Sequence, residues 1–323
     1  MLLSLSSLQV RLTSASTAVN DGWQQLFPGS LQPDANSADL QLHLSLVEQL
    51  PNVPTTTPLF SDEPTAQDER GLISVYGLEH GRILIHYHDG ALVELSLNPD
   101  GDSDVMTGFI TPHTLQHGRL EDITFTSLAP GLRRRGIYLV HAFAASKNGR
   151  ALLIVGTTGS GKTTTGLNLL LNGWQLLAND VVMLETHKNG ILAQSTPGGV
   201  NIRPQTFIQL PLLKQRLTDN TLPQNSVTVS SHTLIKGRWS DPAKVGWICF
   251  PQIEQRPSTM LSAQNRAIAL VQLMEESVDR WDEPALAAHL AFLEALCQQT
   301  AVYNLQLGQD FTEMISRIEA EIM

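Results

Sequence analysis

Cysteine is scarce in this chain, whose 323 residues include only two, Cys249 and Cys297. Both stand among apolar neighbours, which is typical of buried free thiols. Two cysteines so placed favour reduced thiols over a disulfide or a metal pair. We therefore expect a protein of a reducing compartment, the cytoplasm.

Long apolar runs and basic charge are also lacking. No run approaches the roughly 20 residues of a membrane-spanning helix, and Met1 to Leu5 lack the basic segment and continuous apolar stretch of a secretory signal. Lysine and arginine number 21 against 31 aspartates and glutamates, for a net charge of −10. Because nucleic acids and anionic membranes are normally bound by basic faces, we expect neither as a partner.

The chain has the composition of a globular protein, with 42% hydrophobic and 16% charged residues, and its length leaves room for about two domains. Its first part alternates with the period of a strand, as in Leu40–Leu46 and Ile83–His88. Asp89-Gly90, just before the alternating stretch Ala91–Leu97, predicts a hairpin. We predict a β-rich N-terminal module over residues 1–120, in which no chemical motif is recognisable.

A helix predicted over Glu121–Arg134 opens the second part, residues 121–323. The run Arg133-Arg134-Arg135 favours a solvated helix end, where cations suit the helix dipole, over a phosphate contact. The short turn Lys147-Asn148-Gly149-Arg150 joins two predicted strands and forces them antiparallel, whereas common nucleotide-binding sheets are parallel. Later segments make this part mixed α/β: helices over Ala263–Glu276, Pro284–Gln298 and Phe311–Ile322, and a strand over Ala301–Leu307.

The most informative stretch matches the phosphate-loop pattern G-x-x-x-x-G-K-[ST] between a predicted strand, Ala151–Val155, and a predicted helix, Thr164–Leu171. Its residues are Gly156, Thr157, Thr158, Gly159, Ser160, Gly161, Lys162 and Thr163, followed by Thr164. Glycines let backbone N–H groups turn toward phosphate oxygens, and the helix points its positive end at the same anion. Lys162 would reach the β- and γ-phosphates, and the Thr163 hydroxyl would bind Mg²⁺. We predict ATP and Mg²⁺ as cofactors; a glycine-rich turn that matches by chance is the alternative.

A nucleotide site also needs an acid to hold Mg²⁺, and Asp180 follows a predicted apolar strand, Trp174 to Ala178. It comes soon after Lys162, whereas the large classes of phosphate-loop protein place their second acid on a more distant strand. An ordinary turn aspartate is the alternative for Asp180. The short spacing between Lys162 and Asp180 therefore argues against those large classes of phosphate-loop fold.

Together these residues resemble the bacterial HPr kinase/phosphorylase family and its relatives with the phosphoenolpyruvate-carboxykinase-like fold. Family members carry a histidine on the strand before the loop, then the loop, a helix, a glycine-containing turn and an acidic pair. Here His141, Gly173 and Asn179-Asp180 stand at the corresponding positions. The resemblance covers residues 136–203 well and the rest of the second part loosely. It implies an α/β fold with a mixed sheet and an HPr-kinase-like P-loop domain over residues 121–323.

The resemblance also implies roles for single residues. Lys162 would stabilise the transferred phosphoryl group, while Thr163 and Asp180 would hold Mg²⁺. His141 would orient Asp180 or relay a proton, although a satisfied histidine on an apolar strand is the alternative. Asn179 would orient the acceptor or the nucleotide.

Two departures from the family pattern bear on activity. Asn179 replaces the first acid of the pair, and Asn201 replaces a glutamate in a segment whose following glycines are here Pro204-Gln205-Thr206. An amide cannot accept a proton from a hydroxyl as a carboxylate can, so we do not expect the bifunctional activity on HPr itself. Asn201 and Arg203 are candidate substrate-binding residues. A solvated surface role competes with such contacts for Arg203.

Two functions stay open at this point. The leading one is an ATP-dependent kinase whose hydroxyl acceptor is a serine of a peptide or protein, or a small alcohol. The other is a catalytically inactive ATP-binding regulatory or scaffold module, in which Asn179 and Asn201 mark the loss of catalysis. A carboxykinase is a weaker third reading. Lys236 and Arg238 are candidates for a substrate loop, with a solvated role as the alternative, and the ring-like oligomers of the family keep a homo-oligomer open.

Overall fold

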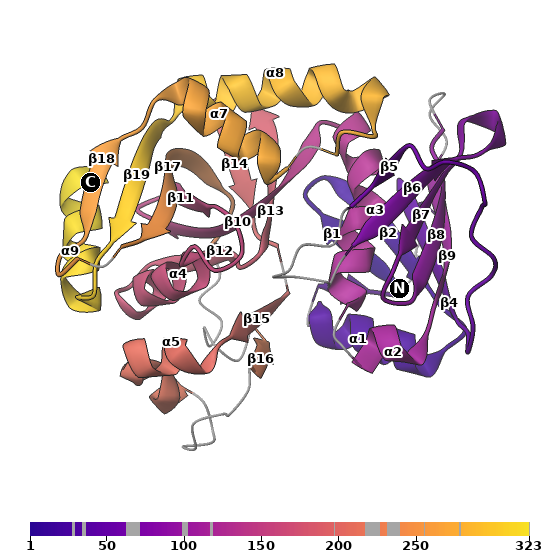
Figure 1. Cartoon of the computed structure of the whole chain (residues 1–323), viewed down its shortest axis with the longest axis horizontal. Helices are drawn as coiled ribbons and strands as arrows, with labels where there is room; N and C mark the ends of the chain where they lie inside the picture. The colour runs from indigo at the N-terminus through magenta and orange to yellow at the C-terminus, as the bar shows by residue number, and fades with distance from the viewer. Residues whose placement is uncertain are drawn as a thin grey trace. The chain divides into compact units, whose positions relative to one another are not determined.

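The computed structural model of the chain describes residues 1–27, 30–33, 37–62, 72–98, 103–116, 119–196, 198–216, 227–230, 240–254, 256–277 and 279–322. Two compact units are present, Met1–Arg135 with Asp279–Ala285, and Gly136–Val278 with Leu286–Met323. Each combines helices with a mixed sheet, so the fold class is α/β (Figure 1). Within the described ranges, no helix has the length and apolar character required to span a membrane.

The first unit is built on a nine-stranded sheet. In spatial order its strands are β3 (Leu31–Gln32), β1 (Leu2–Leu5), β2 (Leu8–Thr13), β4 (Leu40–Leu46), β9 (Asp104–Ile110), β8 (Ala91–Ser96), β7 (Ile83–Tyr87), β6 (Ile73–Gly77) and β5 (Phe60–Ser61). The pairings β2–β4 and β4–β9 are parallel. The hairpin predicted at Asp89-Gly90 joins β7 to β8, but its loop is one residue longer than predicted, because Tyr87 pairs directly with Ala91.

Among its described residues, this unit wholly contains the α-helices α1 (Thr17–Leu26), α2 (Pro112–Gln116) and α3 (Leu120–Arg134). Helix α3 contacts β4, β8 and β9, and its Thr124 hydroxyl accepts a 3.0 Å hydrogen bond from the indole of Trp23 on α1. The sequence places α3 after the boundary at residue 120, whereas in the structure α3 groups with the first unit.

The arginines that end α3 form the solvated helix end that the sequence favoured only in part, because Arg134 is exposed and Arg133 is buried. Arg133 is only 5% exposed, and its guanidinium pairs with Asp279 at 2.5 Å and with Asp282 at 2.8 Å. Arg134 also pairs with Asp282, at 2.7 Å. Carboxylates from a distant part of the chain pair with the guanidinium groups of both arginines. These arginines therefore give no support to the predicted alternative of a phosphate contact.

The second unit is built on an eight-stranded sheet that partly closes on itself. Its strands are β11 (Arg150–Val155), β10 (Ile137–Lys147), β13 (Val181–His187), β14 (Gly190–Gln194), β17 (Ala243–Ile253), β19 (Ala301–Leu307) and β18 (Met260–Ala263), with β12 (Gln175–Ala178) beside β10. Strand β17 pairs with both β14 and β11, so the path from β11 through β10, β13 and β14 returns to its start. As predicted, β10 and β11 are antiparallel, joined through Asn148 and Gly149 with φ of 53° and 73°, the left-handed conformation of a tight hairpin turn.

Strand β11 reads as an unbroken apolar run because both of its faces are buried. Leu152 and Ile154 pack in a core with α4 (Lys162–Leu171) and α9 (Phe311–Ile322). Leu153 and Val155 face a second core with α7 (Arg266–Glu275) and α8 (Glu283–Gln299). Figure 1 shows α4 and α7–α8 on opposite sides of these strands. Strand β11 is thus held from both sides at the point where it leads into the predicted phosphate loop.

Smaller elements complete this unit: the two-stranded sheet of β15 (Gly199–Ile202) and β16 (Val227–Ser230), and the short helix α5 (Pro204–Gln209). The strand predicted over Ala301–Leu307 and the helix predicted over Phe311–Ile322 are confirmed with those bounds. Helix α4 begins two residues earlier than predicted, at Lys162.

Candidate functional site

The predicted phosphate loop is a glycine-rich turn between β11 and α4. Gly159 and Gly161 have φ of 87° and 105°, in the left-handed region that glycine adopts without strain. A Cβ on Gly161 would lie 2.5 Å from a methyl group of Leu307, so a larger residue would have to displace that side chain and would also be strained by the positive φ. Within the part of the chain that the structure describes, no side chain caps the start of α4, which leaves its first N–H groups available to an anion. The buried hydroxyl of Ser160, which has no hydrogen-bond partner among the described residues, also fits a ligand with phosphate oxygens.

Lys162 lies against this loop, and its side chain is largely buried. Its ammonium group donates to the carbonyl oxygens of Gly156 and Thr157, the second at 3.2 Å. Desolvation lowers the pKa of Lys162, and Arg203 adds to that effect, while Glu276 and Asp180 oppose it. The next two residues, Thr163 and Thr164, are partly exposed. The sequence-predicted lysine therefore shares one electrostatic environment with Asp180 and Arg203.

His141 and Asp180 meet at the end of adjacent strands. Strand β10 pairs with β13 up to His141 opposite Val181, which places Asp180 next to the imidazole. His141 Nε2 lies 2.9 Å from Asp180 Oδ1, and the backbone N–H of Ala142 donates to the carbonyl of Asp180, also at 2.9 Å. Asp180 remains half exposed, at 50% of its side chain. Its second carboxylate oxygen could therefore serve a metal ion or a substrate.

Glu276 is a residue of this cluster that the sequence did not reveal. It caps the C-terminus of α7, and its Oε2 lies 2.7 Å from His141 Nδ1. The backbone N–H of His141 donates to the Glu276 carbonyl at 2.9 Å. The Glu276 side chain is only 9% exposed. Nothing in the spacing of the sequence pairs a helix end with a strand so distant along the chain.

Two carboxylates thus flank the His141 ring and set its charge. Desolvation alone would lower the pKa of His141, but the hydrogen bonds to Asp180 and Glu276 raise it to about 9. Desolvation likewise opposes ionisation of Asp180, yet the hydrogen bond from His141 and the charges of His141 and Lys162 hold the pKa of Asp180 below its usual value. Near neutral pH this part of the site holds an imidazolium between two carboxylates.

Asn179 faces the backbone of β15. Its Nδ2 donates to the carbonyl of Gly199 at 3.0 Å, and its buried Oδ1 has no partner among the described residues. Asn201 on β15 and Arg203 after it are exposed. Thr164 lies 3.2 Å from Thr206 of α5, hydroxyl to hydroxyl, which joins the start of α4 to the segment that follows Arg203.

The structure therefore brings His141, Lys162 and Asp180 together and adds Glu276. Lys236 and Arg238 lie outside the described residues. Among the residues that are described, no three histidine, cysteine, aspartate or glutamate side chains gather as a metal cluster. Mg²⁺ commonly takes one or two protein carboxylates and completes its shell with phosphate oxygens and water. The hydroxyl of Thr163 and the carboxylate of Asp180 fit this ligand chemistry.

Comparison with known proteins adds little to this geometry. No family model matches the chain. No curated protein matches it either. Among solved structures 48 chains match, and one of them is the HPr(Ser) kinase/phosphatase from Coxiella burnetii, at 12% identity and a TM-score of 0.29, over 56% of this chain and 94% of that one. A likeness this low carries no argument, so the case for function depends on the residues of the site.

Proposed function

We propose that this chain is an ATP-dependent phosphotransferase that transfers the γ-phosphoryl group to a hydroxyl acceptor. The acceptor is a serine of a peptide or protein, or a small alcohol. One observation carries the proposal: the His141–Asp180 hydrogen bond of 2.9 Å stands in the electrostatic field of Lys162, the lysine of a complete phosphate loop. A loop that only held phosphate would need no such pair.

The chain's own groups divide the work as follows. The backbone N–H groups of the loop and the start of α4 bind the phosphates, and Lys162 neutralises charge on the transferred group. Thr163 and the outer carboxylate oxygen of Asp180 would hold Mg²⁺, which supplies further charge neutralisation between the phosphates. His141, fixed by Glu276 from behind, orients Asp180. Such a site acts mainly by positioning and electrostatics.

Substrate contacts extend the proposal beyond the loop. The side chains of Asn201 and Arg203 are exposed, and we propose that they contact the acceptor or the phosphates. The positive charge of Arg203 lowers the pKa of Lys162, so Arg203 lies within electrostatic range of that lysine. Asn179 acts indirectly, through its bond to the backbone of β15. The two buried free thiols, Cys249 and Cys297, suit a reducing compartment, and we propose the cytoplasm.

A second candidate is an ATP-binding module without transferase activity. It is favoured by the amides at Asn179 and Asn201, where a carboxylate would be able to accept a proton and an amide is not. In that case ATP would stabilise one shape of the protein, and the His141–Asp180 pair would be structural.

Release of ADP that depends on an acceptor separates the two candidates. The purified full chain is incubated with Mg-ATP and, in turn, with free serine, a library of serine-containing peptides and glycerol. A phosphotransferase should release ADP with at least one acceptor class, and Lys162→Ala should abolish both this activity and thermal stabilisation by Mg-ATP. Lys188→Ala, at an exposed lysine in the β13–β14 turn, is the matched control and should change neither. Saturable Mg-ATP binding without turnover on any acceptor would favour the inactive module instead.

A further inference from the structure

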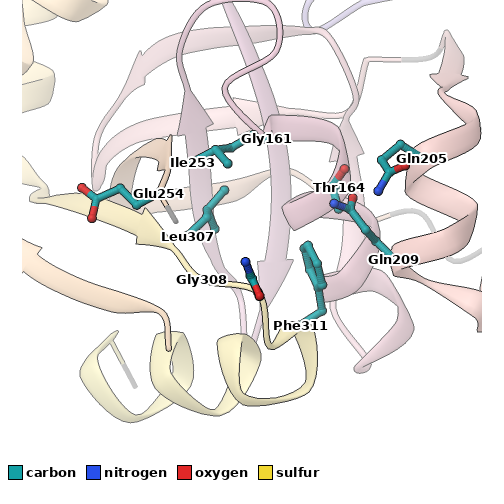
Figure 2. A pocket seen from close by; sticks show the side chains of 10 residues that line it. Gly161, Thr164, Gln205, Gln209, Ile253, Glu254, Leu307, Gly308 and Phe311 are labelled. Atoms are coloured by element: carbon teal, nitrogen blue, oxygen red, sulfur yellow. The ribbon is translucent and has the colours of Figure 1, made fainter. Parts of the chain in front are cut away.

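A pocket of 410 Å³ opens beside the phosphate loop (Figure 2). Its walls come from the start of α4, from α5, from the ends of β17 and β19, and from the start of α9. Gly161 and Thr164 belong both to the loop region and to this pocket, whereas His141, Lys162 and Asp180 do not line it. The volume lies within the roughly 300–1,000 Å³ of pockets that hold small organic ligands.

The pocket occupies the place in the sheet where ligands usually bind. Strand β17 pairs in parallel with β11 on one side and with β19 on the other, so all three end at the same edge. Strand β11 leads into the phosphate loop, and the other two end at Ile253 and Leu307, which both line the pocket. In α/β sheets, ligands bind outside the carboxyl ends of such parallel strands.

The lining suits a flat, uncharged ring better than a phosphate group. Phe311 offers an aromatic face, and Ile253 and Leu307 add apolar surface. Gln205 and Gln209 present amides, each of which can donate and accept hydrogen bonds. Among the described residues that line the pocket there is no lysine, arginine or histidine to neutralise a phosphate. An aromatic ring with a polar edge meets all of these groups.

We propose that this pocket receives the base and ribose of the nucleotide whose phosphates bind the loop, an inference that rests on the proposed function. Backbone N–H groups of a phosphate loop hold the α- and β-phosphates, and the lysine reaches the β- and γ-phosphates. The nucleoside, which is attached to the α-phosphate, therefore lies on the side of the loop away from the transferred γ-phosphoryl group. The His141–Asp180 pair lies where the γ-phosphoryl group is proposed to be transferred, and it does not line the pocket. Thr164, on the first turn of α4, does line the pocket. The base lies against Phe311, and Glu254, whose Oε2 lies 3.4 Å from Arg256 Nη1, accepts hydrogen bonds from ribose hydroxyls.

Binding of two ligands to the full chain tests this assignment. Mg-ATP has a nucleoside, and inorganic tripolyphosphate with Mg²⁺ has only the phosphates. Gln209→Ala and Phe311→Leu should each weaken Mg-ATP binding about tenfold while changing tripolyphosphate binding less than about twofold, because stacking and edge contacts belong to the base alone. Ile208→Ala is the matched control, since Ile208 lies on the same helix, is 60% exposed and does not line the pocket.

The outcomes separate the pocket from the loop. If the parent binds both ligands and neither Gln209→Ala nor Phe311→Leu weakens Mg-ATP, or if both ligands weaken equally, the pocket assignment fails and the phosphate site stands. If the parent binds neither ligand, the proposed function fails and the pocket assignment fails with it. Phe311 also packs against the core, so binding by Phe311→Leu is interpreted only if this variant melts like the parent. If it does not, the half-buried Gln209→Ala variant decides the test.

Discussion

Replacing Asn179 by aspartate should harm this protein, although the change would restore the acidic pair of the family that the sequence resembles. The Asn179 amide nitrogen donates to the Gly199 carbonyl at 3.0 Å. An aspartate would remove this donor and bring a carboxylate oxygen toward the carbonyl oxygen. The contact would change from attraction to repulsion at the start of β15, the strand that carries Asn201.

The size of the effect follows from two contributions. Loss of the hydrogen bond costs about 1 kcal/mol, and an acceptor left buried against another acceptor costs about 1–3 kcal/mol more. The two costs sum to about 2–4 kcal/mol, and at about 2–4 °C per kcal/mol for a unit of this size the melting temperature should fall by roughly 4–16 °C. Asn179→Ala should cost only about 1 kcal/mol, because it removes the unpartnered Oδ1 together with the donor.

Differential scanning calorimetry and acceptor-dependent ADP release should be measured on the parent, Asn179→Asp and Asn179→Ala at equal Mg²⁺. We expect stability in the order parent, alanine variant, aspartate variant, and slower transfer by the aspartate variant. An aspartate variant as stable as the parent and faster in transfer would refute the reasoning. It would mean that the position acts as a proton acceptor and that its bond to Gly199 is incidental.

Asp180→Asn should weaken ATP binding more with Mg²⁺ than in EDTA, because the carboxylate is proposed in the metal shell; equal losses by calorimetry would remove Asp180 from that shell. Cys249 and Cys297 should resist iodoacetamide at about pH 8 and react in urea, since burial raises their thiol pKa values to about 12 and about 11; modification of the folded protein seen by mass spectrometry would contradict this. Acid should destabilise the first unit. Desolvation opposes ionisation of Asp282, but the hydrogen bonds and charges of Arg134 and Arg133 hold the pKa of Asp282 below its usual value. The stabilisation is therefore present above the unfolded pKa of about 3.9 and is lost as pH falls through the folded value, and Asp282→Asn should flatten this dependence in urea titrations.

Local features of the fold could be predicted because neighbouring residues determine them. The turn at Asn148-Gly149 needs two left-handed residues in a row, which this pair adopts readily. The buried run of β11 and the helix after the loop follow from apolar pattern and glycine placement within a few residues. The loop at Asp89-Gly90 shows the limit of such reasoning, since the register of the two strands, not the dipeptide, decided its length.

Contacts between distant parts of the chain could not be predicted from a single sequence. Glu276 supports His141 only because α7 ends where β10 passes, and no motif marks that crossing. The sequence favours a solvated Arg133, because nothing near it marks its partners, Asp279 and Asp282, which come from a distant segment. In sequence, an arginine at the end of a helix that is solvated by water looks the same as one that forms an ion pair with a buried carboxylate.

The parallel ladder that joins β11 to β17 has a consequence for how the protein is made. Ile154, just before the predicted phosphate loop, pairs with Cys249, and Ile253 at the end of β17 pairs with Leu307. During synthesis the loop therefore emerges from the ribosome long before the strands that support it. Pairings between such distant segments form late, because the intervening chain must first be closed into a loop. A nascent chain should acquire affinity for nucleotide only when the segment through Leu307 has been released, which would couple ligand binding to completion of the fold.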